Sequence, residues 1–130
     1  MLLIIGSCVE TQDNKVNYHI INGSNHKINL IYYNDELIDS SKMLFYSDSI
    51  NSIYFGDQGN NLPSPPPFSA DSVCVVFDDS IKIVHYRIQN QGINRNIFEE
   101  DSWILEIISE HEYKYDYIFT EGDYLEAKER

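Results

Sequence analysis

Strict alternation of side-chain types constrains the fold of this chain more than any other feature. From Tyr113 to Phe119 every second residue is aromatic, and Lys114 and Asp116 lie between the tyrosines. A period of two is typical of a β-strand, because successive side chains point to opposite faces. The same period recurs from residue 16 onward, and no long segment shows the helical period of 3.6 residues. The sequence therefore predicts an all-β fold.

Turn-forming residues divide the chain into short strands. The expected strands are residues 16–22, 27–33, 43–47, 50–55, 73–77, 81–88 and 113–119, with a short piece at 37–38. The turn at 22–25 predicts a hairpin between the first two strands, and the turn at 78–80 predicts a second hairpin. Residues 103–108 fit either a strand or a short helix. This spacing predicts one Ig-like β-sandwich of about seven short antiparallel strands, although the Cys-Trp-Cys spacing of immunoglobulin domains is missing.

Two details refine this prediction. Residues 73–77 are apolar on both faces, so we expect a central strand in which Cys74 is a small buried hydrophobe. The segment Thr120-Glu-Gly-Asp123 resembles a capping box, which predicts a short C-terminal helix over 121–128. The aromatic row from Tyr113 to Phe119 has two interpretations, a buried core row or an exposed surface that stacks on sugars. Its alternation with charged residues favours the core.

The longest irregular stretch runs from Gly56 to Ser72 and contains the run Pro63-Ser-Pro-Pro-Pro67. Prolines lack an amide donor and fix φ, so neither a helix nor a central strand fits here. The stretch is either a stiff connection or a recognition loop at one end of the sandwich, and it is our first choice for a binding loop. Asp57, Asn60 and Asn61 offer oxygen ligands for calcium, but their spacing favours a plain turn.

The charge balance excludes one class of partner. The 130 residues include nine Lys and Arg against 21 Asp and Glu, for a formal net charge of −12. Phosphate backbones repel such a surface, so we expect no nucleic-acid partner. Many of the acidic residues follow Glu99. That region either faces a cationic partner or divalent ions, or simply keeps the surface soluble.

The chain begins with the residues Met-Leu-Leu-Ile-Ile-Gly-Ser-Cys. This segment is too short to span a bilayer and lacks a positively charged start. They read as the remnant of a signal peptide, residues 1–7, followed by Cys8. The segment Ile5-Gly6-Ser7-Cys8 resembles the lipobox of bacterial lipoproteins. This resemblance implies cleavage before Cys8 and a diacylglycerol on its sulfur, and acyl chains on that residue anchor a protein stably. Residues 8–15 then form the lipidated cysteine and a flexible tether, and residues 16–130 form the β-sandwich domain.

A wider resemblance covers about 110 residues. The segments that carry it are Tyr18-His-Ile-Ile-Asn22, Pro65-Pro-Pro-Phe68, Asp71-Ser-Val-Cys-Val-Val-Phe-Asp78 and Tyr115-Asp-Tyr-Ile-Phe-Thr-Glu-Gly-Asp-Tyr124. In these segments the chain is similar to small uncharacterised lipoproteins of Bacteroidetes. The resemblance implies a lipid-anchored protein of the cell envelope at the outer membrane, on either its periplasmic or its surface side. It implies no activity.

Few residues indicate chemistry. Ser49, Ser72 and Ser80 each follow an Asp and precede an apolar residue, which looks like the O-glycosylation acceptor of Bacteroidetes and also like a turn entering a strand. The four histidines show no metal-ligand spacing. No nucleophile motif or phosphate-binding loop occurs. We therefore predict no catalytic residues, no metal and no cofactor.

Three functional hypotheses remain. The preferred one is a non-enzymatic, lipid-anchored module that binds a protein or glycan and touches the membrane only through its lipid. The second is an acidic inhibitor or immunity-type protein that masks a basic partner enzyme, and salt-sensitive binding separates it from the first. The third is a hydrolase whose site is assembled from distant residues, which requires a polar cleft with clustered histidines and carboxylates.

Overall fold

The computed structural model describes residues 14–56, 62–88 and 92–130. These residues form eight strands in two four-stranded sheets and a short C-terminal helix, which confirms the all-β prediction. The strands are β1 (Asn14–Asn22), β2 (Ile28–Asn34), β3 (Leu37–Leu44), β4 (Ser49–Gly56), β5 (Ser72–Phe77), β6 (Ile81–Tyr86), β7 (Ile104–Ser109) and β8 (Glu112–Phe119). The helical segments are η2 (Glu100–Ser102) and α2 (Glu121–Glu129).

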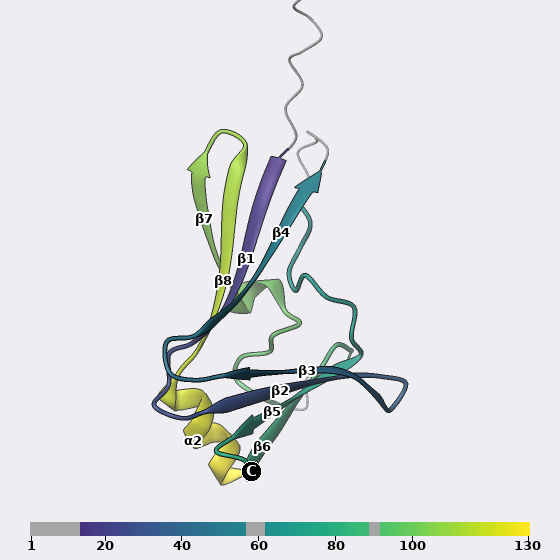
Figure 1. Cartoon of the computed structure of the whole chain (residues 1–130), viewed down its shortest axis with the longest axis vertical. Helices are drawn as coiled ribbons and strands as arrows, with labels where there is room; N and C mark the ends of the chain where they lie inside the picture. Colours follow the sequence, from purple (N-terminus) through teal and green to yellow (C-terminus); the bar gives the residue numbers. More distant parts are fainter. Residues whose placement is uncertain (1–13, 57–61, 89–91) are drawn as a thin grey trace, which may run out of the picture.

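Sheet A has the strand order β4-β1-β8-β7, and sheet B has the order β3-β2-β5-β6. In Figure 1 the strands of sheet B run across those of sheet A, and one end of sheet A projects beyond sheet B. The core lies between the sheets. Tyr115, Tyr117 and Phe119 are at most 3% exposed, so the core interpretation of the aromatic row is confirmed, whereas Tyr113 at its start is only partly buried.

One strand pair contradicts the prediction of purely antiparallel strands. The first and last strands, β1 and β8, lie side by side in parallel, with Tyr18 opposite Tyr115. Their rings stack with centroids 5.8 Å apart and planes 6° apart. Side-chain alternation shows which face of a strand is buried but carries no information about the direction of a neighbour that lies nearly 100 residues away.

The predicted hairpin between the first two strands is also wrong, because β1 belongs to sheet A and β2 to sheet B. The reason lies in the buried side chain of Asn22. Its Nδ2 donates to the carbonyl oxygens of His26 at 2.7 Å and Leu44 at 3.0 Å, and its Oδ1 accepts from the Ser24 amide at 3.0 Å. This network satisfies the backbone where the chain leaves one sheet and enters the other, so the segment is a corner and not a tight hairpin turn.

Strand β3 merges two predicted pieces. Residues 37–38 and part of 43–47 belong to one strand that pairs with β2, and residues 45–47 instead form the connection to β4. Asp35 and Glu36 make the β2–β3 turn with φ angles of 52° and 67°. Residues 104–109 are a strand and not a helix.

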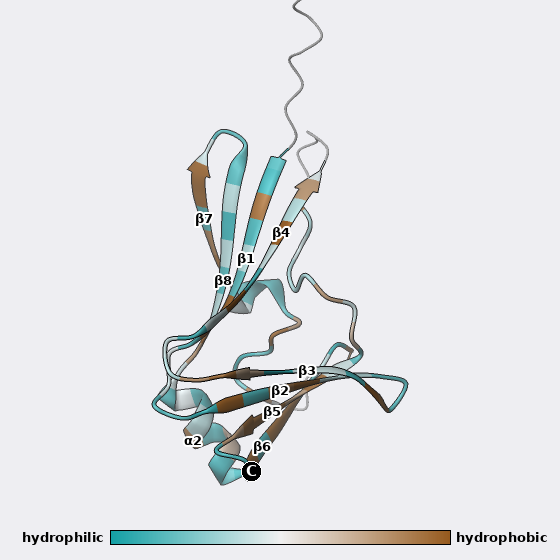
Figure 2. Cartoon of the chain, in the orientation of Figure 1, coloured by the Kyte–Doolittle hydropathy of each residue, from teal (hydrophilic) through white to brown (hydrophobic). Residues whose placement is uncertain are grey.

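Other predictions are confirmed. Strands β5 and β6 form the expected hairpin, and β5 is an inner strand whose residues from Val73 to Phe77 are all buried. Figure 2 shows the apolar character of β5 along its length. Cys74 is buried as expected, and burial raises the pKa of its thiol. The capping box is present, with reciprocal bonds between Thr120 and Asp123 at the start of α2.

The proline-rich connection packs over the sheets. The Tyr18 hydroxyl donates to the carbonyl oxygen of Pro63 at 2.7 Å, and the Ser64 hydroxyl donates to Glu100 Oε1 in η2 at 3.0 Å. The ring of Phe68 meets Tyr32 edge-on, with centroids 4.9 Å apart. The described part of the expected recognition loop is thus held against the core. Asp57, Asn60 and Asn61 lie outside the described residues.

Candidate functional site

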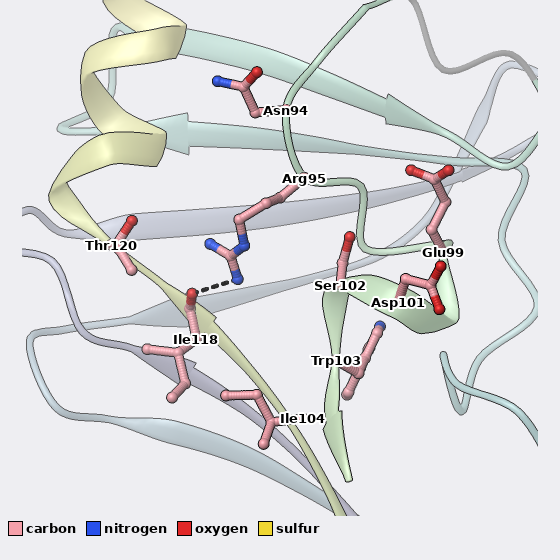
Figure 3. A pocket seen from close by; sticks show the side chains of 9 residues that line it. All are labelled: Asn94, Arg95, Glu99, Asp101, Ser102, Trp103, Ile104, Ile118 and Thr120. Carbon is pink, nitrogen blue, oxygen red and sulfur yellow. Dashed lines mark hydrogen bonds between the residues drawn. The ribbon is translucent and has the colours of Figure 1, made fainter.

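A cavity of about 720 Å³ opens where the connection from β6 to β7 passes the end of β8. Figure 3 shows the side chains around it. We call it the Arg95 cavity, and its lining consists of Asn94, Arg95, Glu99, Asp101, Ser102, Trp103, Ile104, Ile118 and Thr120.

The wall formed by the β6–β7 connection is held by buried contacts. Ile97 is fully buried, and its amide donates to Nδ1 of His85 at 2.9 Å. The side-chain amide of Asn96 donates to the carbonyl oxygen of Tyr86 at 3.0 Å. The indole N–H of Trp103 donates to the carbonyl oxygen of Ile97 at 2.8 Å. The cavity wall is therefore preorganised, although it belongs to a connection and not to a strand.

Arg95 projects toward the end of β8 from one side of the cavity (Figure 3). Its Nη1 lies 2.6 Å from Oδ2 of Asp123, and its Nη2 donates to the carbonyl oxygen of Ile118 at 2.8 Å. Its guanidinium carbon lies 4.5 Å from the centroid of the Tyr117 ring. A guanidinium has five N–H donors, so these two bonds leave donors for another group. About a third of the side chain, 32%, is exposed.

The opposite side of the cavity carries negative charge. Figure 3 places the carboxylates of Glu99 and Asp101 there, with the apolar side chains of Ile104 and Ile118 on another wall. A cation on one side and carboxylates on the other suit a polar segment that brings both a positive charge and hydrogen-bond acceptors. Trp103 is only 5% exposed, so its ring closes the wall and offers no open face for stacking.

Two hydroxyl side chains, those of Ser102 and Thr120, line the cavity. Ser102 is a potential nucleophile, but its Oγ accepts a hydrogen bond from the Asn96 amide at 3.1 Å. The lining contains neither histidine nor cysteine, and its carboxylates are those of Glu99 and Asp101. Among the residues that the structure describes, no group of three or more His, Cys, Asp or Glu side chains is arranged to hold a metal ion.

A second hollow of about 470 Å³ lies on the outer face of sheet B. Ser72 on β5 pairs with Tyr33 on one side and Tyr86 on the other, so a small residue separates two tyrosines across three strands. Buried Cys74 lies further along the same face of β5. The other lining residues are Asp35, Glu36, Asp71 and Val84. This groove is smaller than the Arg95 cavity and contains no basic residue.

The structure also assembles a histidine cluster that the sequence did not suggest. His26 Nδ1 lies 2.5 Å from Oδ2 of Asp78, and its Nε2 lies 3.2 Å from Oε2 of Glu121. The ring stacks on Tyr124 with centroids 3.6 Å apart. Desolvation opposes the charged form, but hydrogen bonds and charges from Asp78 and Glu121 outweigh it and raise the pKa of His26. The cluster ties the β1–β2 corner to the β5–β6 turn and to α2.

The predicted modification sites do not come together. Ser49 is exposed at the start of β4 in sheet A. Ser72 is partly buried in the sheet B groove, whereas Ser80 is exposed in the turn beyond the other end of β5. Cys8 lies outside the described residues.

Sequence reasoning missed the Arg95 cavity because its lining combines an irregular connection, residues 94–103, with Ile118 and Thr120 at the distant end of β8. The one local signal was Arg95 itself, a basic residue in a polar stretch that precedes a run of acidic residues. That pattern does not reveal the partner, because Asp123 lies 28 positions further along.

Comparison with known proteins identifies no relative: no family model, no curated protein and no solved structure matches this chain. Within the described part of the chain, no helix has the length and apolar character needed to cross a membrane.

Proposed function

We propose that this chain is a non-enzymatic binding module, anchored in a bacterial cell envelope by lipid on Cys8, that takes a basic segment of a partner protein into the Arg95 cavity. The observation that carries the binding role is the cavity itself. Its wall is fixed by buried hydrogen bonds of Asn96, Ile97 and Trp103. The cation of Arg95 lies on one side of the cavity, and the carboxylates of Glu99 and Asp101 lie on the opposite side. A preformed hollow with a few directed polar groups over an apolar wall is the usual form of a ligand site.

The charge of the chain supports a basic partner. Carboxylates outnumber cations by 12 over the whole sequence. Arg95 in the cavity lining and Lys114, which contacts Glu106 of β7, already lie within 4 Å of carboxylates, Arg95 beside Asp123 and Lys114 beside Asp116. A partner segment that brings lysine or arginine to Glu99 and Asp101 meets net attraction, whereas an acidic segment is repelled.

The anchor is proposed from the sequence. Ile5-Gly6-Ser7-Cys8 has the residue types of a lipobox, and the resemblance to Bacteroidetes lipoproteins favours the outer membrane.

Within this proposal the sandwich is of the Ig-like kind. Sheet B supports that relation, because its hairpins β2–β3 and β5–β6 join through the antiparallel inner strands β2 and β5. Ser49 and Ser80 are exposed and suit the proposed O-glycosylation. Ser72 is partly buried in the sheet B groove, so a glycan could be attached to its hydroxyl only if that groove widened.

A peptide selection tests the binding role. A phage-displayed library of random peptides is selected on the wild-type chain at low salt, and the affinities of the recovered peptides are then measured. We expect enrichment in lysine and arginine. We also expect binding at least tenfold weaker to a Glu99→Lys, Asp101→Lys double variant, and weaker binding as salt rises.

The matched control is the double variant Glu110→Lys, Glu129→Lys, which changes the net charge equally at two exposed positions away from the cavity. It should bind the peptides within about twofold of wild type. Equal losses in the two double variants would show that overall charge and not the cavity governs binding. Selected peptides without basic residues would refute the proposal.

The acidic inhibitor or immunity-type protein remains the second candidate, because the same carboxylates could mask a basic enzyme. The distinguishing result is functional. A masking protein abolishes the activity of its partner enzyme at one-to-one stoichiometry, whereas a binding module leaves the activity of its partner unchanged.

A further inference from the structure

Seven large apolar side chains are exposed on the two edge strands of sheet A, and five of them lie toward one end of the sheet. The exposed fractions are 56% for Ile53, 45% for Tyr54, 66% for Phe55, 67% for Ile107 and 46% for Ile108. Ile53, Tyr54 and Phe55 lie just before the end of β4 at Gly56, and Ile107 and Ile108 lie just before the end of β7 at Ser109. We call these five residues the sheet A tip. Isolated exposed apolar residues need no explanation, but a group on a chain of net charge −12 indicates a contact.

The register of sheet A places the tip beside the start of β1. Phe55 is opposite Lys15, and Tyr54 is opposite Val16. On the other side of β1, Val16 is opposite Tyr113, which in turn is opposite Ile107 of β7. Figure 1 shows this end of sheet A projecting away from sheet B, and Figure 2 shows the hydrophobic colouring of β7 at that end. The projecting end therefore has exposed apolar side chains along both of its margins.

The proposed anchor is close to this end. Cys8 precedes Asn14, the first residue of β1, by six positions. Six residues span at most about 20 Å when fully extended, at about 3.3–3.6 Å per residue. A lipid on Cys8 thus keeps the sheet A tip within about 20 Å of the lipid surface, and no other end of the domain lies as near to the tether.

The chemistry of the tip fits an interface between lipid and water. Tyrosine side chains are enriched at the level of the headgroups, and isoleucine and phenylalanine gain by leaving water. The nearby charge is small and negative, because Lys15 is opposite Glu112 and the adjoining turn adds Glu110. Such an end suits a zwitterionic lipid surface better than a strongly anionic one.

We propose that the sheet A tip rests in the headgroup layer of the membrane and so fixes the orientation of the domain. This inference rests on the proposed anchoring through Cys8. It goes beyond a purely covalent attachment, because the folded domain itself then contacts lipid. The tip orients β1 away from the membrane, so the end of β8 and the Arg95 cavity beside it are presented to partners.

The test uses the full chain, purified from a bacterial envelope and reconstituted in phosphatidylcholine vesicles. A Cys74→Ala background allows one introduced cysteine to carry an environment-sensitive fluorophore, either at Phe55→Cys in the tip or at Leu125→Cys on α2. Leu125 is the matched control, because it is an apolar residue of similar exposure, 52%, on α2, which follows the other end of β8. Quenching by lipids with a spin label near the headgroup reports contact with the membrane.

We expect a blue-shifted emission at position 55 and quenching at least threefold stronger than at position 125. Mass spectrometry of the same sample reports whether Cys8 carries acyl chains. Acylated protein with equal quenching at both positions overturns the tip proposal and leaves the anchor intact. Absence of acyl chains overturns both proposals. Shielding of position 55 from aqueous quenchers without quenching by the labelled lipids would indicate a second protein copy on the tip, and would also overturn the proposal.

Discussion

Acid should destabilise this protein mainly through His85, a histidine buried in the core. The residue lies on the inner face of β6 and is 3% exposed. Its ring is packed edge-on or tilted against Tyr117 and Phe119, with centroids 6.4 and 6.3 Å away. Its Nδ1 accepts the amide of Ile97, so the neutral ring already has a role in the fold. Burial, followed by the nearby charge of Arg95, lowers the pKa of His85 from 6.5 to about 3.

The sign of the pH effect follows from this depressed pKa. Above pH 6.5 the histidine is neutral in both the folded and the unfolded chain, so its contribution to stability is fully present. As the pH falls below 6.5, His85 becomes protonated in the unfolded chain but stays neutral in the folded chain. This difference stabilises the unfolded chain increasingly until the pH reaches the folded pKa of about 3. Each pH unit in this range lowers the free energy of unfolding by about 1.4 kcal/mol, so the decrease is about 3 kcal/mol at pH 4.5 and about 5 kcal/mol at or below pH 3.

The measurement compares urea unfolding of the wild type and of His85→Gln at pH 7 and pH 4.5. Glutamine cannot titrate, and its side-chain oxygen can still accept the Ile97 amide. Carboxylates titrate in both proteins, so their effect cancels in the comparison. We expect the free energy of unfolding to fall by about 3 kcal/mol more in the wild type than in the variant, a large share of the 5–15 kcal/mol typical of a domain. Equal losses in the two proteins would refute this account of His85.

The remaining predictions concern the β1–β2 corner and the helix. His26 has a raised pKa, so the stability that its protonated form adds is fully present below pH 6.5 and is lost as the pH rises through that pKa. Between pH 6 and 9 the melting temperature of the wild type should therefore fall more than that of His26→Gln. Parallel curves of melting temperature against pH would contradict this prediction. Asn22→Ala leaves the carbonyl groups of His26 and Leu44 without their donor, so urea unfolding should show a free energy of unfolding that is lower by about 3 kcal/mol. A decrease below about 1 kcal/mol would mean that water replaces the side-chain amide. Thr120→Ala should cost about 1 kcal/mol in the same assay, and Thr120→Ser should restore most of it.

Most strands of this fold could be predicted, because the alternation of side chains is local. The β5–β6 hairpin needed only residues 73–86 and the turn between them, and the helix start needed only Thr120 and Asp123. Confirmed predictions of this kind depend on patterns within about 15 residues. The alternation alone also predicts Tyr115 and Tyr117 as core residues, and both are buried.

The failures share a different property, since each depends on contacts between distant segments. The hairpin predicted for β1 and β2 required a tight turn at Asn22, but its side chain is buried against the carbonyl oxygen of Leu44, 22 positions away. The parallel pairing of β1 with β8 joins residues about 97 positions apart. The Arg95 cavity was missed for the same reason, because the ion pair with Asp123 bridges the β6–β7 connection and α2.

The parallel pairing of the first and last strands explains how the two proposed contacts are separated. Because β8 runs alongside β1 in the same direction, Phe119 ends opposite Asn22, and α2 begins where the chain crosses into sheet B. Residues at that end of β8, including Ile118 and Thr120, line the Arg95 cavity. The start of β1 is necessarily at the opposite end. An antiparallel β8 would instead bring its C-terminal end, and with it the Arg95 cavity, next to the start of β1. Under the two proposals, the direction of this one strand pair therefore keeps the proposed binding cavity away from the proposed lipid anchor.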